Sequence, residues 1–435
     1  MSSRRASQAE AAAKPAAAGA GELIEVAAGI GRRLTGEAIW HSDRCNWIGG
    51  TVVPGPFGSL IEHQKALDLT LYEGTAGVAF FLTELYTATG EPEVRRTALG
   101  AIGQAIDAAN ASPPGRALYS GTAGIALTAA RAGRALSEPG LVEAARGLAR
   151  EIAAAPTAED EELDLLNGTS GTLLGLLALS ELLDEPELVA AAGRLGDGLL
   201  EAAEEDELGL SWGSRTMPTQ HNLTGLSHGA AGIALALIEL HRATGDARFA
   251  RGAERAFDYE QGRFDSGARN WPDFRDLDPQ RPATAPGFAT FWCHGGPGIA
   301  LSRLTALEQL AGGARRWRAE AATGLAVTEE TVVRGLAHRA DNFSLCHGIG
   351  GNAEILAEGA RVLGGRWARG AELASETAAA GASWYGPTGT WPCGAGSRET
   401  PGLMLGLAGI GYFYLRMAGA PVPSVLRPQA NELSR

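Results

Sequence analysis

The sequence predicts an all-α fold, an α/α toroid in which seven inner helices lie inside a ring of seven outer helices. A glycine signature recurs seven times along the 435 residues, and self-similarity at a period of this size indicates a repeat architecture. An apolar run follows each signature, and amphipathic segments lie between the runs. Each repeat is therefore expected to contain a buried helix followed by a half-buried one.

The signature opens the first repeat as Gly74–Gly77, directly ahead of the apolar run Val78–Leu82. The later copies start 47, 47, 61, 66, 53 and 58 residues apart, at Gly121, Gly168, Gly229, Gly295, Gly348 and Gly406. Because glycine has no Cβ, these positions let an inner helix and its entry loop approach closely. We expect the role of most of these glycines to be structural.

In the first three repeats a proline predicts the start of the outer helix. Pro92, Pro139 and Pro186 each lie 18 residues after the first glycine of their repeat, and each follows a glutamate. Proline fits the first helical position, where no intrahelical N–H bond is lost. Beyond Pro186, apolar residues from Leu188 to Leu199 recur at helical spacing and predict one buried face.

The two ends of the repeat array favour a closed ring. Residues Glu22–Leu34 supply an amphipathic helix before the first repeat, and the last apolar run, Leu403–Leu415, is as apolar as the others. An open solenoid would need polar capping repeats at its ends. We therefore expect a single domain over residues 21–435, preceded by a disordered alanine-rich tail at residues 1–20.

The composition excludes several classes of partner. The net charge of −13 argues against nucleic acid and offers no basic face to a membrane. The longest apolar run is interrupted by three glycines and is too short to span a bilayer. No secretory signal is recognisable at the N-terminus. We expect a cytoplasmic protein.

Long connections in the middle of the chain indicate the binding face. Residues 203–224 and 259–291 are rich in Trp, Pro, Gly and Asp, and they lead into the repeats that open with His228 and Cys293. Long loops on one face of a repeat array usually form its binding surface.

Two cysteines in look-alike motifs indicate a metal site. Cys293 and Cys346 are two of only four cysteines, and each is followed by a histidine, His294 or His347, and a glycine. Two thiolates and an imidazole suit zinc, and three protein ligands leave a fourth position open for catalysis. Two alternatives remain open, namely buried apolar cysteines and a Cys293–Cys346 disulfide, although nothing suggests an oxidising compartment.

Two further polar residues, Asp164 and His228, also stand just before glycine signatures. Equivalent points of successive repeats meet at one end of a ring, so these side chains are expected to lie near the cysteines. Asp164 ends an acidic run that is alternatively a solvated loop, and His228 is alternatively a structural histidine. His294 is interpreted as a residue that supports the site or faces the substrate.

The seven signatures, Ser227-His228-Gly229, Trp292-Cys293-His294-Gly295 and Cys346-His347-Gly348 together resemble the lanthionine synthetase C-like (LanC-like) family, the lanthipeptide cyclases. The resemblance runs from about residue 20 to the end. The motif Asn270–Asp273 is closer in style to the cyclase half of LanM-type synthetases. Those synthetases carry a large dehydratase, for which this chain has no room, so we expect a separate dehydratase partner.

The resemblance implies a double ring of helices and a Zn²⁺ ion held by Cys293, Cys346 and His347. It implies acid/base roles for His228 and Asp164. Its substrate would be a dehydrated precursor peptide, whose cysteine thiols add to dehydroalanine or dehydrobutyrine to form lanthionine or methyllanthionine. Some family members have an arginine four residues before the first zinc cysteine, and here that place is Ala289. Arg398 is one candidate for supplying the missing cation.

Other interpretations of the sequence remain open. The chain could be a non-catalytic, zinc-stabilised scaffold of a synthetase complex, or it could add glutathione-type thiols to dehydrated peptides. An unrelated α/α toroid, such as a glycosidase or prenyltransferase, would have six repeats, and the seven signatures count against it. Cys45 and Cys393 fit no motif.

Overall fold

The computed structural model describes residues 18–434 except 55–59, 157, 159, 276–284, 341 and 397. The expected disordered tail falls outside the described residues as far as residue 17. Helix α1 already begins at Ala20, so the toroid starts at the end of that expected tail.

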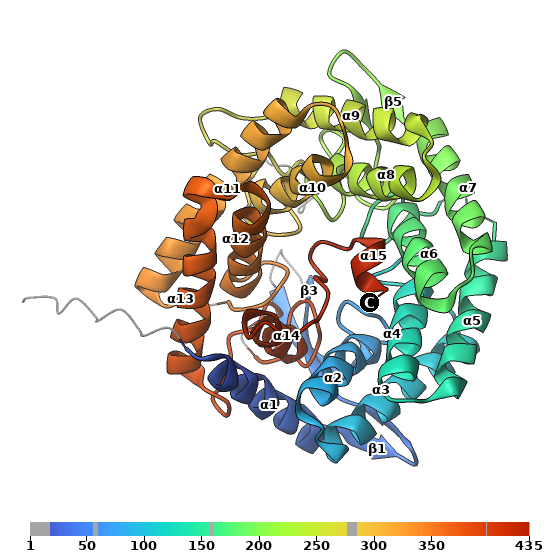
Figure 1. Cartoon of the computed structure of the whole chain (residues 1–435), viewed down its shortest axis with the longest axis vertical. Helices are drawn as coiled ribbons and strands as arrows, with labels where there is room; N and C mark the ends of the chain where they lie inside the picture. The colour runs from blue at the N-terminus through green and yellow to red at the C-terminus, as the bar shows by residue number, and fades with distance from the viewer. Residues whose placement is uncertain are drawn as a thin grey trace, which may run out of the picture.

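The described residues form the predicted double ring of helices (Figure 1). The inner ring consists of α2 (Thr75–Thr89), α4 (Thr122–Ala135), α6 (Thr169–Leu183), α8 (Ala230–Thr244), α10 (Gly296–Gln309), α12 (Ile349–Leu363) and α14 (Leu407–Met417). The outer ring consists of α1 (Ala20–Glu37), α3 (Pro92–Ala111), α5 (Pro139–Ala154), α7 (Glu187–Glu201), α9 (Ala247–Gly262), α11 (Ala314–His338) and α13 (Ala368–Tyr385). The prediction of an all-α toroid is confirmed.

Burial explains which helices lie inside. In α6 every residue except Glu181 is buried, as expected of a helix surrounded on all sides. The outer helix α7 buries only one face, which includes the predicted Leu188 and Leu199. Prolines begin α3 and α5 as predicted, whereas Pro186 stands one residue before α7 as its N-cap.

The ring closes through the first helix of the chain. Each inner helix from α2 to α12 packs against the outer helix that follows it, and α14 packs instead against α1. Helix α14 also contacts α2, so the inner ring is continuous from the seventh repeat to the first (Figure 1). Among the described residues, closure leaves no exposed end repeat, which agrees with the apolar character of the last buried helix.

Short antiparallel hairpins interrupt the helices, and the sequence patterns did not predict them. Between α1 and α2 the chain forms β1 (Ile39–His41) with β2 (Arg44–Asn46), and β3 (Ile48–Pro54) with β4 (Leu60–Ala66). A third hairpin, β5 (Glu204–Glu205) with β6 (Leu210–Ser211), lies in the first long loop. Cys45 on β2 is buried, and its thiol donates to the Thr97 carbonyl at 3.5 Å, which gives this cysteine a packing role.

After α14 the chain returns to the centre of the ring, where it ends with α15 (Ala430–Leu433) (Figure 1). This C-terminal segment is buried: the Tyr119 hydroxyl donates to the Val425 carbonyl at 2.6 Å, and the Trp292 indole donates to the Leu426 carbonyl at 2.7 Å. Arg427 is 1% exposed and donates to the Thr305 hydroxyl at 2.9 Å. The segment therefore fills the space inside the inner ring, up to the residues that precede α4 and α10.

None of the helices in the described part of the chain is both long enough and apolar enough to cross a membrane.

Candidate metal and acid–base site

The second glycine of each signature fixes the loop that carries the site residues. A Cβ atom at this glycine would lie 1.7–2.3 Å from the carbonyl oxygen six residues earlier, in all seven repeats. Because real Cβ atoms do not approach so closely, only glycine lets the loop fold back over the first turn of the inner helix. The backbone therefore follows a similar path in each repeat, and equivalent residues occupy equivalent places.

Backbone hydrogen bonds connect these loops from repeat to repeat, at the residue two positions before the first glycine. The bonded N–H and carbonyl pairs are Tyr72 to Tyr119 at 2.8 Å, Leu166 to Ser227 at 3.0 Å, Ser227 to Cys293 at 3.1 Å, Cys346 to Met404 at 2.9 Å and Met404 to Tyr72 at 2.8 Å. The last bond joins the seventh repeat to the first. Between the fifth and sixth repeats, the Trp292 N–H donates to the Cys346 carbonyl at 3.0 Å. The loops thus form one rim at the N-terminal ends of the inner helices.

Three of the predicted site residues come together on this rim. The ligand atoms of Cys293, Cys346 and His347 all lie within 4.8 Å of one another. All four cysteines of the chain are free thiols, so the disulfide alternative is not realised in the structure. Cys346 is buried and the other two are half-buried, so the cluster is enclosed but reachable.

The donor set fits a zinc ion. The His347 Nε2 atom lies 3.0 Å from the Gly394 carbonyl oxygen. Because a carbonyl can only accept, Nε2 donates, which leaves Nδ1 free to bind a cation. A Cβ on Gly394 would lie 2.7 Å from His347 Nε2, so a larger residue there would force the imidazole or the Gly394 backbone to shift. Two thiols and an oriented imidazole are the ligand types that zinc prefers.

The two thiols have pKa values shifted in opposite directions. A hydrogen bond from Cys346 lowers the pKa of Cys293, whereas burial raises the pKa of Cys346 well above its ordinary value. The two thiols therefore titrate as a coupled pair, and burial opposes the ionisation of both.

Tyr72 is a site residue that the sequence reasoning missed. Its hydroxyl donates to Cys346 Sγ at 3.0 Å, and burial raises the pKa of the hydroxyl well above its ordinary value, so it remains a donor. Tyr72 stands two residues before Gly74, the same register that Cys346 occupies before Gly348. Comparing this register across all repeats would have revealed it.

Asp164 and His228 form a hydrogen-bonded pair. His228 Nδ1 lies 2.6 Å from Asp164 Oδ2, and the two side chains are 10% and 4% exposed. Since a carboxylate only accepts, Nδ1 carries the proton and Nε2 is left available for proton transfer. The Asn167 N–H donates to the other carboxylate oxygen at 2.6 Å. Asp164 is thus a buried partner of an imidazole, not a residue of a solvated loop.

His294 lies directly against this pair. Its ring stacks on the His228 ring at a centroid distance of 5.7 Å, and the residue is 2% exposed. Among the described residues, neither ring nitrogen has a hydrogen-bond partner. Burial and the nearby Arg275 charge lower the pKa of His294 to about 3, so the imidazole is neutral. An unsatisfied buried polar group costs about 1–3 kcal/mol, which is unusual for a residue with only a structural role.

Arg275 is a cation whose charge interacts with both thiols. It binds Asp273 through two side-chain nitrogens, with the shortest contact at 2.7 Å. Burial opposes its charge, but Asp273 and the two thiols raise its pKa overall. Arg398 is exposed, and Cys393 is buried with a weak hydrogen bond to the Thr400 carbonyl at 3.9 Å. The sequence missed Arg275 because it lies in a long irregular loop.

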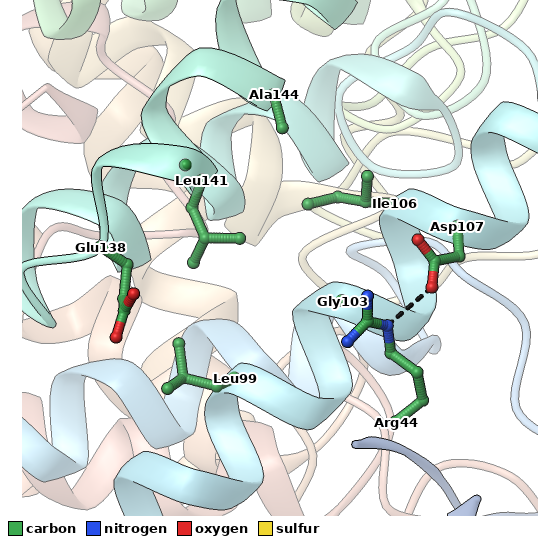
Figure 2. A pocket seen from close by; sticks show the side chains of 9 residues that line it. Arg44, Leu99, Gly103, Ile106, Asp107, Glu138, Leu141 and Ala144 are labelled. Carbon is green, nitrogen blue, oxygen red and sulfur yellow. Dashed lines mark hydrogen bonds and ion pairs between the residues drawn. The ribbon is translucent and has the colours of Figure 1, made fainter. Parts of the chain in front are cut away.

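The larger surface cavities lie elsewhere. Figure 2 shows one of about 360 Å³ on the outer ring, between α3 and α5. Leu99 and Leu141 line it, and within it the Arg44 guanidinium donates to the Asp107 carboxylate at 2.6 Å. Another, of about 800 Å³, is lined by residues at the C-terminal ends of inner helices. Neither includes a cysteine or histidine among its described lining residues, so the rim remains the candidate site.

Comparison with known proteins identifies the class. A model of the family described as lanthionine synthetase C-like protein matches residues 65–426. Among solved structures, the chain is similar to nisin cyclase, with 20% identity over 80% of this chain and 88% of that chain and a TM-score of 0.56. A GH76 α-mannanase from Bacteroides thetaiotaomicron is 10% identical, covering 92% of this chain and 96% of that chain at a TM-score of 0.47.

An unsaturated glucuronyl hydrolase specific for heparin is 13% identical, over 70% of this chain and 82% of that chain, at a TM-score of 0.43. No curated protein sequence matches the chain significantly. The fold and the seven repeats define an α/α-toroid protein. Because the family model covers most of its length, the chain belongs to the lanthionine synthetase C-like family.

Proposed function

We propose that the protein is a zinc-dependent lanthipeptide cyclase, which joins peptide cysteine thiols to dehydroalanine or dehydrobutyrine and forms lanthionine or methyllanthionine rings. The observation that carries the proposal is one rim that holds both a Cys293–Cys346–His347 cluster and a His228–Asp164 pair. Family membership and the fold likeness to a protein named nisin cyclase support it.

Cys293, Cys346 and His347 would hold the zinc ion. When bound, zinc lowers the pKa of a coordinating substrate thiol, so that the sulfur becomes a nucleophile near neutral pH. Tyr72, through its hydrogen bond to Cys346 Sγ, favours the thiolate form of that sulfur and orients it. Such outer hydrogen bonds tune the ligands of metal sites.

In this proposal the His228–Asp164 pair carries the proton from the substrate thiol to the α-carbon. His228 Nε2 accepts the proton of the substrate thiol, and Asp164 stabilises the resulting imidazolium through Nδ1. The thiolate adds to the β-carbon, the carbon–carbon π bond breaks, and its electrons move to the amide carbonyl oxygen as an enolate. His228 then returns the proton to the α-carbon. One S–C and one C–H bond form, one S–H and one π bond are lost, and no redox partner is needed.

The substrate of this proposal is a precursor peptide that a separate dehydratase has already modified. In the alternative of a non-catalytic scaffold, metal removal would unfold the protein and His228 would be dispensable. In the alternative of external thiol addition, glutathione would add to the alkene and no ring would form.

The test is incubation of the purified protein with a dehydrated, cysteine-containing peptide, followed by counting free thiols and by chiral analysis of the hydrolysed product. We expect loss of free thiols and one ring configuration, because a shaped site admits one approach of sulfur to the alkene. Dehydro residues also react without an enzyme, so a protein-free control is essential. The same product mixture with and without protein would refute the proposed activity, and glutathione adducts would indicate the external-thiol reaction.

A further inference from the structure

His294 has no use in the proton transfer described above, yet it is placed inside the site. It follows Cys293 in the chain, its ring stacks on His228, and it is 2% exposed. Neither of its ring nitrogens is bonded to another described residue. Buried polar groups in folded proteins nearly always have a partner. An imidazole without one, beside a candidate catalytic residue, indicates a position reserved for a ligand.

Asp273 is a possible hydrogen-bond acceptor for His294, but it is bonded to Arg275 instead. The Asp273 carboxylate lies 3.9 Å from His294 Nδ1, beyond hydrogen-bond distance. Both of its oxygens are held instead by Arg275, with N–O distances of 3.0 Å to Oδ1 and 2.7 Å to Oδ2. This ion pair holds the carboxylate at a distance from the imidazole at which the two do not hydrogen bond. His294 therefore remains an uncommitted donor.

Two other donors near the cysteines already have protein partners. The Tyr72 hydroxyl donates to Cys346 Sγ, and Arg275 donates to Asp273. His228 is committed through Nδ1 to Asp164 and uses Nε2 for the proton. The proposed addition nevertheless creates negative charge on a carbonyl oxygen, and such a charge needs a preorganised donor in a site shielded from water.

We propose that His294 is a second catalytic histidine, which donates a hydrogen bond from Nε2 to the carbonyl oxygen of the dehydro residue as the enolate forms. This inference rests on the proposed cyclase function and assigns separate tasks to the two stacked imidazoles. His228 moves the proton between sulfur and the α-carbon. His294 keeps its own proton and stabilises the oxygen on which the charge develops. The neutral Nε2–H tautomer is available because none of the described residues fixes either nitrogen.

The two tasks predict different defects. Loss of the enolate donor slows addition but leaves the protonation face unchanged, since His228 still delivers the proton. Loss of His228 slows the reaction and also removes control over the configuration of the α-carbon. A substitution that merely disturbs packing would instead lower zinc content or stability.

The experiment compares His294→Leu and His294→Gln with wild type, with His228→Asn, and with His338→Asn as a matched control on the exposed end of α11. For each variant, zinc content, urea unfolding, kcat, KM and product configuration are measured on a dehydrated peptide. We expect His294→Leu to keep its zinc and its single configuration and to lose about 10²–10³ in kcat, as for removal of one oxyanion donor. His294→Gln, whose amide can still donate, should recover part of the rate.

Three results would overturn the inference. An active wild type with unchanged kcat in His294→Leu would refute the role of His294 and leave the proposed cyclase function intact. Equal zinc loss in the Leu and Gln variants would make His294 a residue of the metal site. A wild type that forms no rings would refute the cyclase function and, with it, this assignment.

Discussion

The second glycine of the signature should be the most sensitive position of each repeat. In Gly232→Ala the new Cβ would lie 2.0 Å from the Leu226 carbonyl oxygen and 2.8 Å from Leu165 Cβ. Ordinary van der Waals contact begins at 3.4 Å, so the entry loop must move by more than 1 Å to accommodate the methyl group. That loop carries His228, whose bond to Asp164 is only 2.6 Å long.

The matched control is Gly147→Ala in the outer helix α5, where a Cβ would meet nothing within 4 Å. Alanine is favoured over glycine inside a helix by about 1 kcal/mol, so this variant should be more stable than wild type. The same gain applies at Gly232, but overpacking of a tight interior costs about 1–3 kcal/mol or more. We therefore expect the free energies of unfolding of the two variants to change in opposite directions.

Urea unfolding, monitored by circular dichroism, measures both free energies of unfolding. The cyclisation assay measures whether the variant with the displaced loop retains activity. We expect Gly232→Ala to lose stability and most of its activity, while Gly147→Ala keeps its activity. Equal stability of the two variants would show that the loop can relax freely, and the argument that glycine fixes the rim would then be wrong.

Three further predictions concern the rim. Purified protein should contain one zinc per chain, and Cys346→Ala should lose most of it; full occupancy in a Cys293→Ala, Cys346→Ala double variant would exclude the proposed ligands. His228→Asn should keep zinc and fold but form rings about 10²–10⁴ times more slowly, as for loss of a general acid/base, and zinc loss in this variant would mark His228 as a ligand. Tyr72→Phe should weaken zinc affinity about 10–100-fold through the lost hydrogen bond to Cys346, measured by chelator competition, with unchanged affinity as the contrary result.

The sequence by itself determined the architecture, because the signals for it are local and repeated. The apolar runs after each signature predict helices buried on all sides, and the amphipathic segments predict helices with one buried face. The apolar last run, with no polar cap, favoured a closed ring, and α1 packs against α14 as that argument requires. The shared register before each glycine also indicated which side chains should meet.

Only the tertiary structure decided how the site residues are paired, because the partners come from distant parts of the chain. Tyr72 and Cys346 are 274 residues apart, and His228 and Asp164 are 64 apart. The hairpins, the Arg275–Asp273 pair and the return of residues 422–433 into the ring also lie outside the repeat. Irregular segments have no periodicity from which their path can be read, and their positions depend on which buried groups they satisfy. His294 is the clearest example. The sequence shows only a histidine beside a cysteine, whereas the folded structure shows that both of its ring nitrogens are buried without a hydrogen-bond partner among the described residues.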